Sequence, residues 1–249
     1  SDLTGSGASY TATIEPTANG DATVEIHTQT LSDAPENSNE VSNTLTVNYD
    51  ETAPTVEITT ETDSPTNGTF DVTITFSEDV TSFEIGAIQV TNGAASDLTG
   101  SGASYTATIE PTADGDVTVE VPGESASDDA GNSNEISNTL TLNYDATAPT
   151  VEITTEADSP TNSAFDVTIT FSEDVTGFEI GAIQVTNGTT SDLTGSGRND
   201  TATIDPTSAG DVTVEVPGES ASDEAGNSNE ASNTLTVNYD ETAPTVEIT

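Results

Sequence analysis

The chain has 249 residues, of which 45 are Asp or Glu, one is Arg and one is His, so its formal net charge is −44. Phosphate recognition requires Lys and Arg to displace counterions, so this charge argues against nucleic acids and anionic membranes as partners. Cys is absent, which excludes disulfides and thiol chemistry, and no apolar run reaches the roughly 20 residues of a membrane-spanning helix.

The sequence repeats with a period of 95 residues. Ser-Asp-Leu-Thr-Gly begins at Ser1, Ser96 and Ser191, and Thr-Ala-Pro-Thr-Val-Glu-Ile-Thr begins at Thr52, Thr147 and Thr242. A period of this length predicts an array of small domains rather than one large globule or a solenoid. We therefore divide the chain into a partial repeat (1–49), two complete repeats (50–144 and 145–239) and the start of another (240–249).

Apolar and polar residues alternate in short segments, which predicts half-buried β-strands. The partial repeat 1–49 contains only the last four strands of a unit. In the first complete repeat the expected strands are 56–60, 70–76, 83–90, 96–98, 105–109, 117–121 and 139–144. In the second they include 165–171, 178–185, 201–204, 212–216 and 234–239, and residues 240–249 should supply one further strand. The predicted fold class is all-β: tandem seven-stranded Greek-key immunoglobulin-like β-sandwiches arranged end to end.

The partial segments leave two possibilities open. Either the array continues beyond them, which we favour, or they complement a neighbouring copy of the chain. A sandwich without its first three strands cannot close a core, so residues 1–49 are expected to be unstable alone.

Short linkers join the repeats. Only about four residues separate the last strand of one unit from the first of the next, and Pro149 restricts the backbone there. The units should therefore sit end to end with little freedom, so that acidic loops of two neighbours meet at each junction. For the first junction the candidates are Asp21, Asp50, Glu78, Asp79, Asp128, Asn132 and Asn134. For the second they are Asp63, Asp114, Asp116, Asp145, Glu173, Asp174, Asp223, Asn227 and Asn229, and the period places Asp158, Asp211 and Asp240 at the next one.

Converging carboxylates without Lys or Arg repel one another unless a cation lies among them. Hard oxygen ligands on loops suit Ca²⁺, so calcium is the expected cofactor. High salt around a halophilic surface is the alternative, and the two can coexist. For any single carboxylate a solvated loop is the ordinary interpretation.

The segment Asp128-Asp-Ala-Gly-Asn132-Ser-Asn134 is the most specific motif. Asp, Asn and Gly in this order allow a loop to turn back while directing side-chain oxygens inward. An ordinary Asx turn explains the same residues, and the spacing is not that of an EF-hand.

Three motifs together carry a family resemblance. They are Asp-x-Thr-Ala-Pro-Thr in the linkers, Phe-Ser-Glu-Asp-Val-Thr-x-Phe after the second strand, and Asp-x-Ala-Gly-Asn-x-Asn before the last strand. They resemble the bacterial immunoglobulin-like repeats in the extender regions of Bap-like and RTX-type surface adhesins. The resemblance implies secretion to the cell surface, a calcium-rigidified rod, and roles in adhesion or biofilm cohesion.

Three functions compete. A structural extender is favoured, with neighbouring repeats of the chain as its partners and an unknown surface ligand bound elsewhere. Carbohydrate or protein binding by one face is less favoured, because aromatic residues are 4% of the chain and Trp is absent. Self-association into a filament or sheath is the third. An enzyme is not expected, because the chain has no Cys, no Lys and only one unrepeated His, so the usual nucleophile–base pairs cannot form.

One position departs from the repeat pattern. Tyr10 and Tyr105 occupy equivalent places in their repeats, but Asp200 stands there in the third. A charge in place of a core aromatic is expected to weaken the start of that strand.

Overall fold

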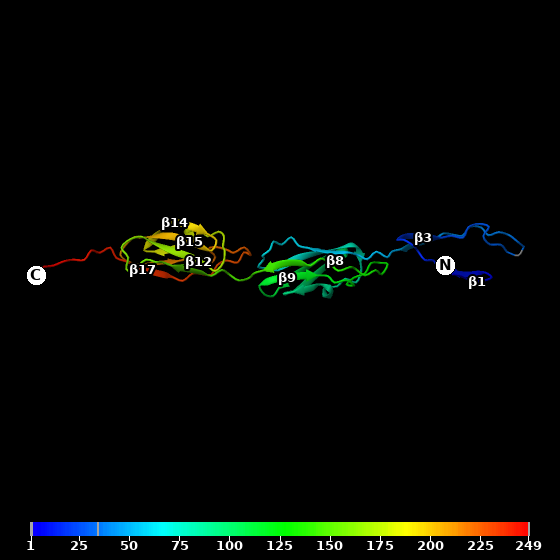
Figure 1. Cartoon of the computed structure of the whole chain (residues 1–249), viewed down its shortest axis with the longest axis horizontal. Coiled ribbons are helices and arrows are strands. Elements are labelled where there is room, and N and C mark those ends of the chain that lie inside the picture. Colours follow the sequence, from blue (N-terminus) through cyan, green and yellow to red (C-terminus); the bar gives the residue numbers. More distant parts are fainter. Residues whose placement is uncertain (1, 34, 249) are drawn as a thin grey trace.

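The structure is a computed structural model that describes residues 2–33 and 35–248. It is elongated: two β-sandwiches follow one another along the long axis, the hairpins of residues 2–49 lie at one end, and an extended segment lies at the other (Figure 1). Within the described residues the only helical segments are two short 3₁₀ turns, η1 (Ile85–Ala87) and η2 (Ile180–Ala182). No helix among them has the length and apolar character to cross a membrane.

The second sandwich shows the complete topology. One sheet has the order β11-β12-β15-β14, and the other has the order β13-β16-β17, with every pair antiparallel. The strands are β11 (Val151–Thr154), β12 (Phe165–Phe171), β13 (Gln184–Thr186), β14 (Gly188–Ser196), β15 (Asn199–Pro206), β16 (Gly210–Glu215) and β17 (Leu235–Tyr239). If β11 to β17 are lettered A to G in chain order, one sheet is ABED and the other is CFG, which is the constant-type immunoglobulin arrangement. The predicted seven-stranded Greek-key sandwich is confirmed.

The first sandwich repeats this arrangement with two longer strands. Its strands are β5 (Val56–Thr59), β6 (Phe70–Val80), β7 (Gln89–Thr91), β8 (Gly93–Pro111), β9 (Gly115–Glu120) and β10 (Leu140–Tyr144). The long β8 covers both the fourth and the fifth strand of the second sandwich. Gly102 lies within β8 at φ +65°, in the left-handed region that favours glycine.

Residues 2–49 form two separate hairpins. β1 (Leu3–Ser6) pairs with β2 (Ser9–Ala12), and β3 (Gly20–Val24) pairs with β4 (Leu45–Tyr49), so the four expected strands are present. Their apolar side chains remain in solvent: Tyr10 is 54% exposed, whereas the equivalent Tyr105 is 8% exposed. Residues 241–248 form no strand in the structure, and the strand expected at the far end stays a prediction. The first strand of each sandwich pairs with the second, and these residues have no such neighbour.

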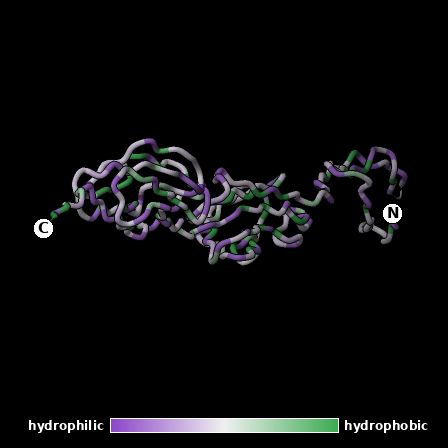
Figure 2. Tube along the Cα trace, turned by 60° about the vertical axis from the view of Figure 1, so that its left-hand side comes forward, coloured by the Kyte–Doolittle hydropathy of each residue, from purple (hydrophilic) through white to green (hydrophobic). Residues whose placement is uncertain are grey.

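Alternation of side chains builds each core. On β6, Phe70, Val72, Ile74 and Phe76 are at most 3% exposed, while the residues between them face outward. The colours of Figure 2 change between hydrophobic and hydrophilic over short distances along the chain. Full burial of such a side chain stabilises the fold by about 1.5–3 kcal/mol, so each small core depends on almost every inward position.

The third strand is shorter than predicted. Residues 83–90 were expected to form one strand, but they contain the turn η1, and β7 begins only at Gln89; residues 178–185 behave in the same way. Phe83 and Ile88 both enter the core although they are five residues apart, an odd spacing that a continuous strand cannot provide. The Ile88 N–H donates to the Ile85 carbonyl at 3.1 Å, which closes the turn that reverses the side-chain direction.

Candidate metal centres at the repeat junctions

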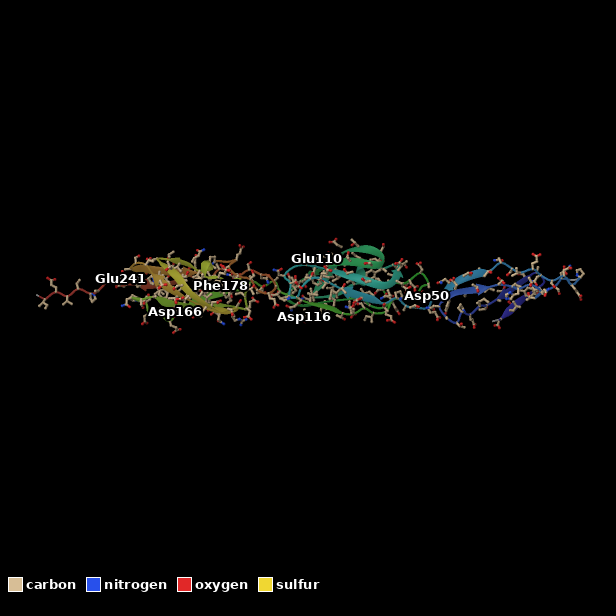
Figure 3. The ribbon with its side chains drawn as sticks, turned by 90° about the horizontal axis from the view of Figure 1, so that it is seen from above. Asp50, Glu110, Asp116, Asp166, Phe178 and Glu241 are labelled. Carbon is tan, nitrogen blue, oxygen red and sulfur yellow. The ribbon has the colours of Figure 1, made fainter. Side chains whose placement is uncertain are left out.

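Three carboxylates meet at each junction between repeats. Oxygens of Asp50, Glu78 and Asp128 all lie within 4.8 Å of one another. Asp50 directly follows β4, Glu78 lies near the end of β6, and Asp128 belongs to the loop before β10. Figure 3 places Asp50 where the chain passes from the hairpins of residues 2–49 into the first sandwich.

The same arrangement recurs 95 residues later. Oxygens of Asp145, Glu173 and Asp223 lie within 4.8 Å of one another, between the first and second sandwiches. In both clusters the loop aspartate is buried and the other two carboxylates are half-buried. All six residues are among the candidates predicted from the sequence, and we call these two clusters the first and second junction triads.

The Asp-Asn-Gly loop holds one carboxylate of each triad in place. Asp128 accepts hydrogen bonds from the backbone N–H of Gly131 at 2.7 Å and of Asn132 at 2.9 Å, and from Asn132 Nδ2 at 2.8 Å. Asn132 Nδ2 also donates to the Asp50 carbonyl at 3.1 Å, which joins the loop to the linker. Gly131 has φ +94°, so the turn depends on glycine. The loop is an Asx turn, and it also orients the Asp128 carboxylate toward the other two carboxylates of the triad.

The second triad is held by equivalent contacts. Asn227 donates its backbone N–H to Asp223 Oδ1 at 2.8 Å, and its Nδ2 donates to Asp223 Oδ2 at 2.9 Å and to the Asp145 carbonyl at 2.8 Å. Asn227 Oδ1 accepts a hydrogen bond at 3.2 Å from Asn67, in a loop of the preceding sandwich. The two sandwiches are therefore bonded across the junction by side chains as well as by the linker.

Electrostatics within the triads oppose full ionisation. Burial raises the pKa of Glu78, and the charges of Asp50 and Asp128 raise it further. Burial likewise raises the pKa of Glu173, as do the charges of Asp145 and Asp223, whereas Arg198 acts in the opposite direction. Hydrogen bonds from Asn132, chiefly through its side chain, hold the pKa of Asp128 below its usual range. A cation placed among these oxygens would relieve the repulsion.

Hydrogen bonds with side chains of the preceding repeat hold the linker residues in place. Asp114 accepts hydrogen bonds from the Ala146 N–H at 2.8 Å and from the Thr147 hydroxyl, and these lower its pKa. At the first junction, Asn19 stands in the place of Asp114 and donates from Nδ2 to Asp50 Oδ1 at 3.0 Å. Asn19 was not among the predicted residues, although its alignment with Asp114 at the 95-residue period points to it.

Two predicted ligands are wrong on geometric grounds. Asn134 is 3% exposed, and its Oδ1 accepts the backbone N–H groups of Ser125 and Ala126, both at 2.8 Å. Asn229 makes the equivalent pair of bonds. Both acceptor positions of each amide oxygen are used inside the loop, so these side chains fasten the loop instead of facing the junction.

The remaining predicted ligands lie outside the triads. Asp21, Asp116 and Asp211 accept cross-strand hydrogen bonds from Asn48, Asn143 and Asn238 at 3.0–3.2 Å, on exposed strand positions. Asp79 and Asp174 lie against Gly102 and Gly197 instead. Asp63 is exposed and belongs to neither triad. Asp158 and Asp240 line one open hollow of about 740 Å³ at the far end of the second sandwich.

The triads supply hard oxygen donors and no nitrogen or sulfur, which fits Ca²⁺ or Mg²⁺ and disfavours softer metals. Three carboxylates fall short of the six to eight oxygens of a calcium shell, so backbone carbonyls and water would complete it. Among the described residues, the only ion pair is His27 with Glu25, away from both triads.

Comparison with known proteins identifies the family. The model of the family described as "Bacterial Ig-like domain" matches residues 50–144 and 145–239, about three quarters of the chain. The chain therefore belongs to the bacterial Ig-like domain family. A search of curated proteins gave no match.

Several solved structures are similar in fold. The Escherichia coli adhesin FdeC aligns at 14% identity and TM-score 0.44 over 79% of this chain and 68% of that one. Invasin, a bacterial integrin-binding protein, aligns at 17% identity and TM-score 0.41 over 83% of this chain and 52% of that one. The Yersinia pseudotuberculosis adhesin InvE aligns at 17% identity and TM-score 0.27 over 75% and 58%. At these identities the likeness concerns the fold alone.

Proposed function

We propose that this chain is part of the stalk of a bacterial surface adhesin, and that calcium at the repeat junctions stiffens the stalk. The observation that carries the proposal is the recurrence of a carboxylate triad at both junctions. The stalk would hold an adhesive region away from the cell surface and contribute to attachment or biofilm cohesion. It would act outside the cell, with neighbouring repeats as its main partners.

The geometry favours reach over ligand binding. The sandwiches lie in line along the molecule, and their linkers are bonded on both sides (Figure 1). A rod of this kind separates its ends with few residues, which is a mechanical property and needs no specialised pocket. No catalytic role is proposed.

Calcium is supported by the location of the triads. Each one combines a linker aspartate with two carboxylates of the following sandwich, so an ion bound there would restrain the angle between units. Without an ion, the same carboxylates repel one another at the point where the rod would bend. Binding of an ion to the folded form only would raise the melting temperature by mass action.

Small-angle scattering and thermal melting of the whole chain test the proposal in chelator, in millimolar calcium and in NaCl of matched ionic strength. We expect calcium to raise the melting temperature and to increase the maximum dimension of the particle, whereas matched NaCl should do neither to the same extent. Stabilisation by molar salt alone would contradict the calcium sites and support a halophilic surface.

Matched variants locate the effect. Glu173→Gln removes one charge from the second triad, and Glu152→Gln makes the same change on the exposed face of β11. We expect the first variant to weaken calcium binding at the junction and the second to leave it unchanged. Equal calcium responses in the two variants would argue against binding by the triad.

Self-association into a filament is the alternative. Exposed apolar side chains on the hairpins of residues 2–49, among them Leu3, Tyr10 and Val47, favour it. Sedimentation velocity over a range of concentrations separates the two proposals, because a stalk segment stays monomeric and a filament subunit does not.

A further inference from the structure

The second sandwich has a cavity next to Asp200. It measures about 190 Å³ and lies among Val175, Phe178, Leu193, three glycines, Ser196 and Asp200. Asp200 faces inward from β15, opposite Ile169 on β12 and Gly195 on β14. It is only 6% exposed.

The first sandwich shows what normally fills this space. There Tyr105 occupies the position of Asp200, and its ring packs edge-on against Phe76 and Phe83 with centroid distances of 6.0 and 5.0 Å. In the second sandwich only the pair Phe171–Phe178 remains, at 5.3 Å. The third ring of the aromatic cluster is therefore missing, and the Asp200 carboxylate lies at the base of the space that this ring would fill.

A second substitution enlarges the same space. Ser82 of the first sandwich is replaced by Gly177, which lines the cavity. Phe83 is buried, whereas its counterpart Phe178 is half-buried and borders the cavity. Two differences between otherwise similar repeats thus converge on one place, and each removes side-chain volume.

We propose that this cavity is a binding site for a small aromatic cation. A ring would take the place that the Tyr105 ring holds in the first sandwich, beside Phe178 and Leu193. A protonated nitrogen would pair with the Asp200 carboxylate, which is 6% exposed and lines the cavity. A cavity of about 150 Å³ suffices for benzene, so the size is adequate.

The chemistry of the site favours a ligand that has both an aromatic ring and a positive charge. A carboxylate in a largely buried position interacts with a cation more strongly than an exposed one does, because water screens it less. The ring of Phe178, which lines the cavity, can attract a cation in addition. The net charge of −44 raises the local concentration of any cation near the chain.

Benzylammonium is a suitable probe, with benzyl alcohol as the same ring without charge and methylammonium as the charge without a ring. Calorimetric titration of the whole chain at moderate NaCl measures binding, and amide chemical shifts locate it. We expect saturable binding of benzylammonium alone, with shifts at Gly177, Phe178 and Asp200. The equivalent amides of the first sandwich, at Ser82, Phe83 and Tyr105, should not move.

Variants make the test specific. Asp200→Asn should weaken the binding of benzylammonium by about tenfold or more, the loss expected for one charge-assisted hydrogen bond. Asp200→Tyr should abolish it by filling the cavity. Ser82→Gly combined with Tyr105→Asp should create a second site in the first sandwich.

Two results would overturn the proposal: equal binding of benzylammonium and methylammonium, or shifts spread over the acidic surface. Both are measured on the unmodified chain, so they do not depend on whether a variant folds. The cavity is separate from the junction triads, and failure here would leave the proposed stalk function untouched.

Discussion

At the scale of single residues, buried asparagines fasten the loop that the triads depend on. Asn134 has its oxygen bonded to two backbone N–H groups, and its Nδ2 donates to the carbonyls of Pro122 and Glu135 at 3.0 and 2.6 Å. All of its hydrogen-bonding capacity is used within one loop. The Asn134 side chain therefore supplies hydrogen-bond partners to backbone groups in a segment that forms no regular strand.

We expect Asn134→Ala to destabilise the first sandwich by about 2–3 kcal/mol, since several buried backbone groups would lose their partner. Chemical denaturation of the whole chain measures the change. Asn143→Ala removes an exposed cross-strand bond and serves as the control, with an expected effect below about 0.5 kcal/mol. Equal losses in the two variants would contradict a structural role for the buried amide.

Asp200 is the residue at which the second sandwich departs from its repeat. Burial raises the pKa of this carboxyl group. A group whose folded-state pKa is raised favours the folded state below its unfolded pKa, and this contribution is lost as the pH rises through the folded pKa. At neutral pH the charge therefore lowers the stability of the second sandwich.

Asp200→Tyr should stabilise the second sandwich by about 1–2 kcal/mol, because the ring fills the cavity and the buried charge is removed. The gain should be larger at pH 7 than at pH 3, where the native carboxyl group is neutral. Thermal melting at both pH values measures it. A destabilised variant would show that the cavity is too small for the ring.

At the scale of elements, the loops and the linker at a junction respond to pH together. The pKa values of Glu78 and Glu173 are raised. In chelator, each triad therefore destabilises the folded state least when these groups are protonated. Junction stability should then fall as the pH rises through the raised folded-state pKa. Calcium neutralises the carboxylate charges, so this trend should be largely absent when calcium is bound.

We expect melting temperatures in chelator to decrease between about pH 4 and pH 7, and those in calcium to change little over the same range. Differential scanning calorimetry measures both series. Glu78→Gln should flatten the chelator series at the first junction, while Glu57→Gln, an exposed substitution on β5, should not. Identical pH series with and without calcium would contradict metal binding at the triads.

At the scale of the whole molecule, charge and shape are connected. A net charge of −44 on an elongated chain keeps the sandwiches apart and favours an extended form, but it also lowers the stability of each compact unit. Figure 3 shows side chains with oxygen ends along the full length of the molecule. At about 0.1 M salt, charges more than roughly 10 Å apart are largely screened.

In chelator, raising NaCl from about 0.02 M to about 0.5 M should therefore raise the melting temperature and reduce the radius of gyration, as the junctions become free to bend. With calcium bound, the radius of gyration should change little over the same range. Scattering at each salt concentration provides the measurement. A salt-independent shape in chelator would mean that hydrogen bonds alone hold the junctions straight.

The sequence by itself determined the repeat and the strand alternation, and it placed the six triad residues within a larger set of candidates. A period of 95 residues and inward positions spaced by two are properties of the chain, and short linkers bring together whatever flanks them. The alternation rule failed for segment 83–90, because a turn between Phe83 and Ile88 changes which side chains face inward.

Only the tertiary structure decided which of the acidic and amide residues are available as ligands. Asn132 and Asn134 look alike in sequence, yet one bridges to the linker and the other is used up inside its loop. The cavity beside Asp200 also required the structure, because it arises from Gly177 and Asp200 on different segments. Hydrogen-bond partners and packing between distant segments are set by the folded arrangement, so local pattern cannot specify them.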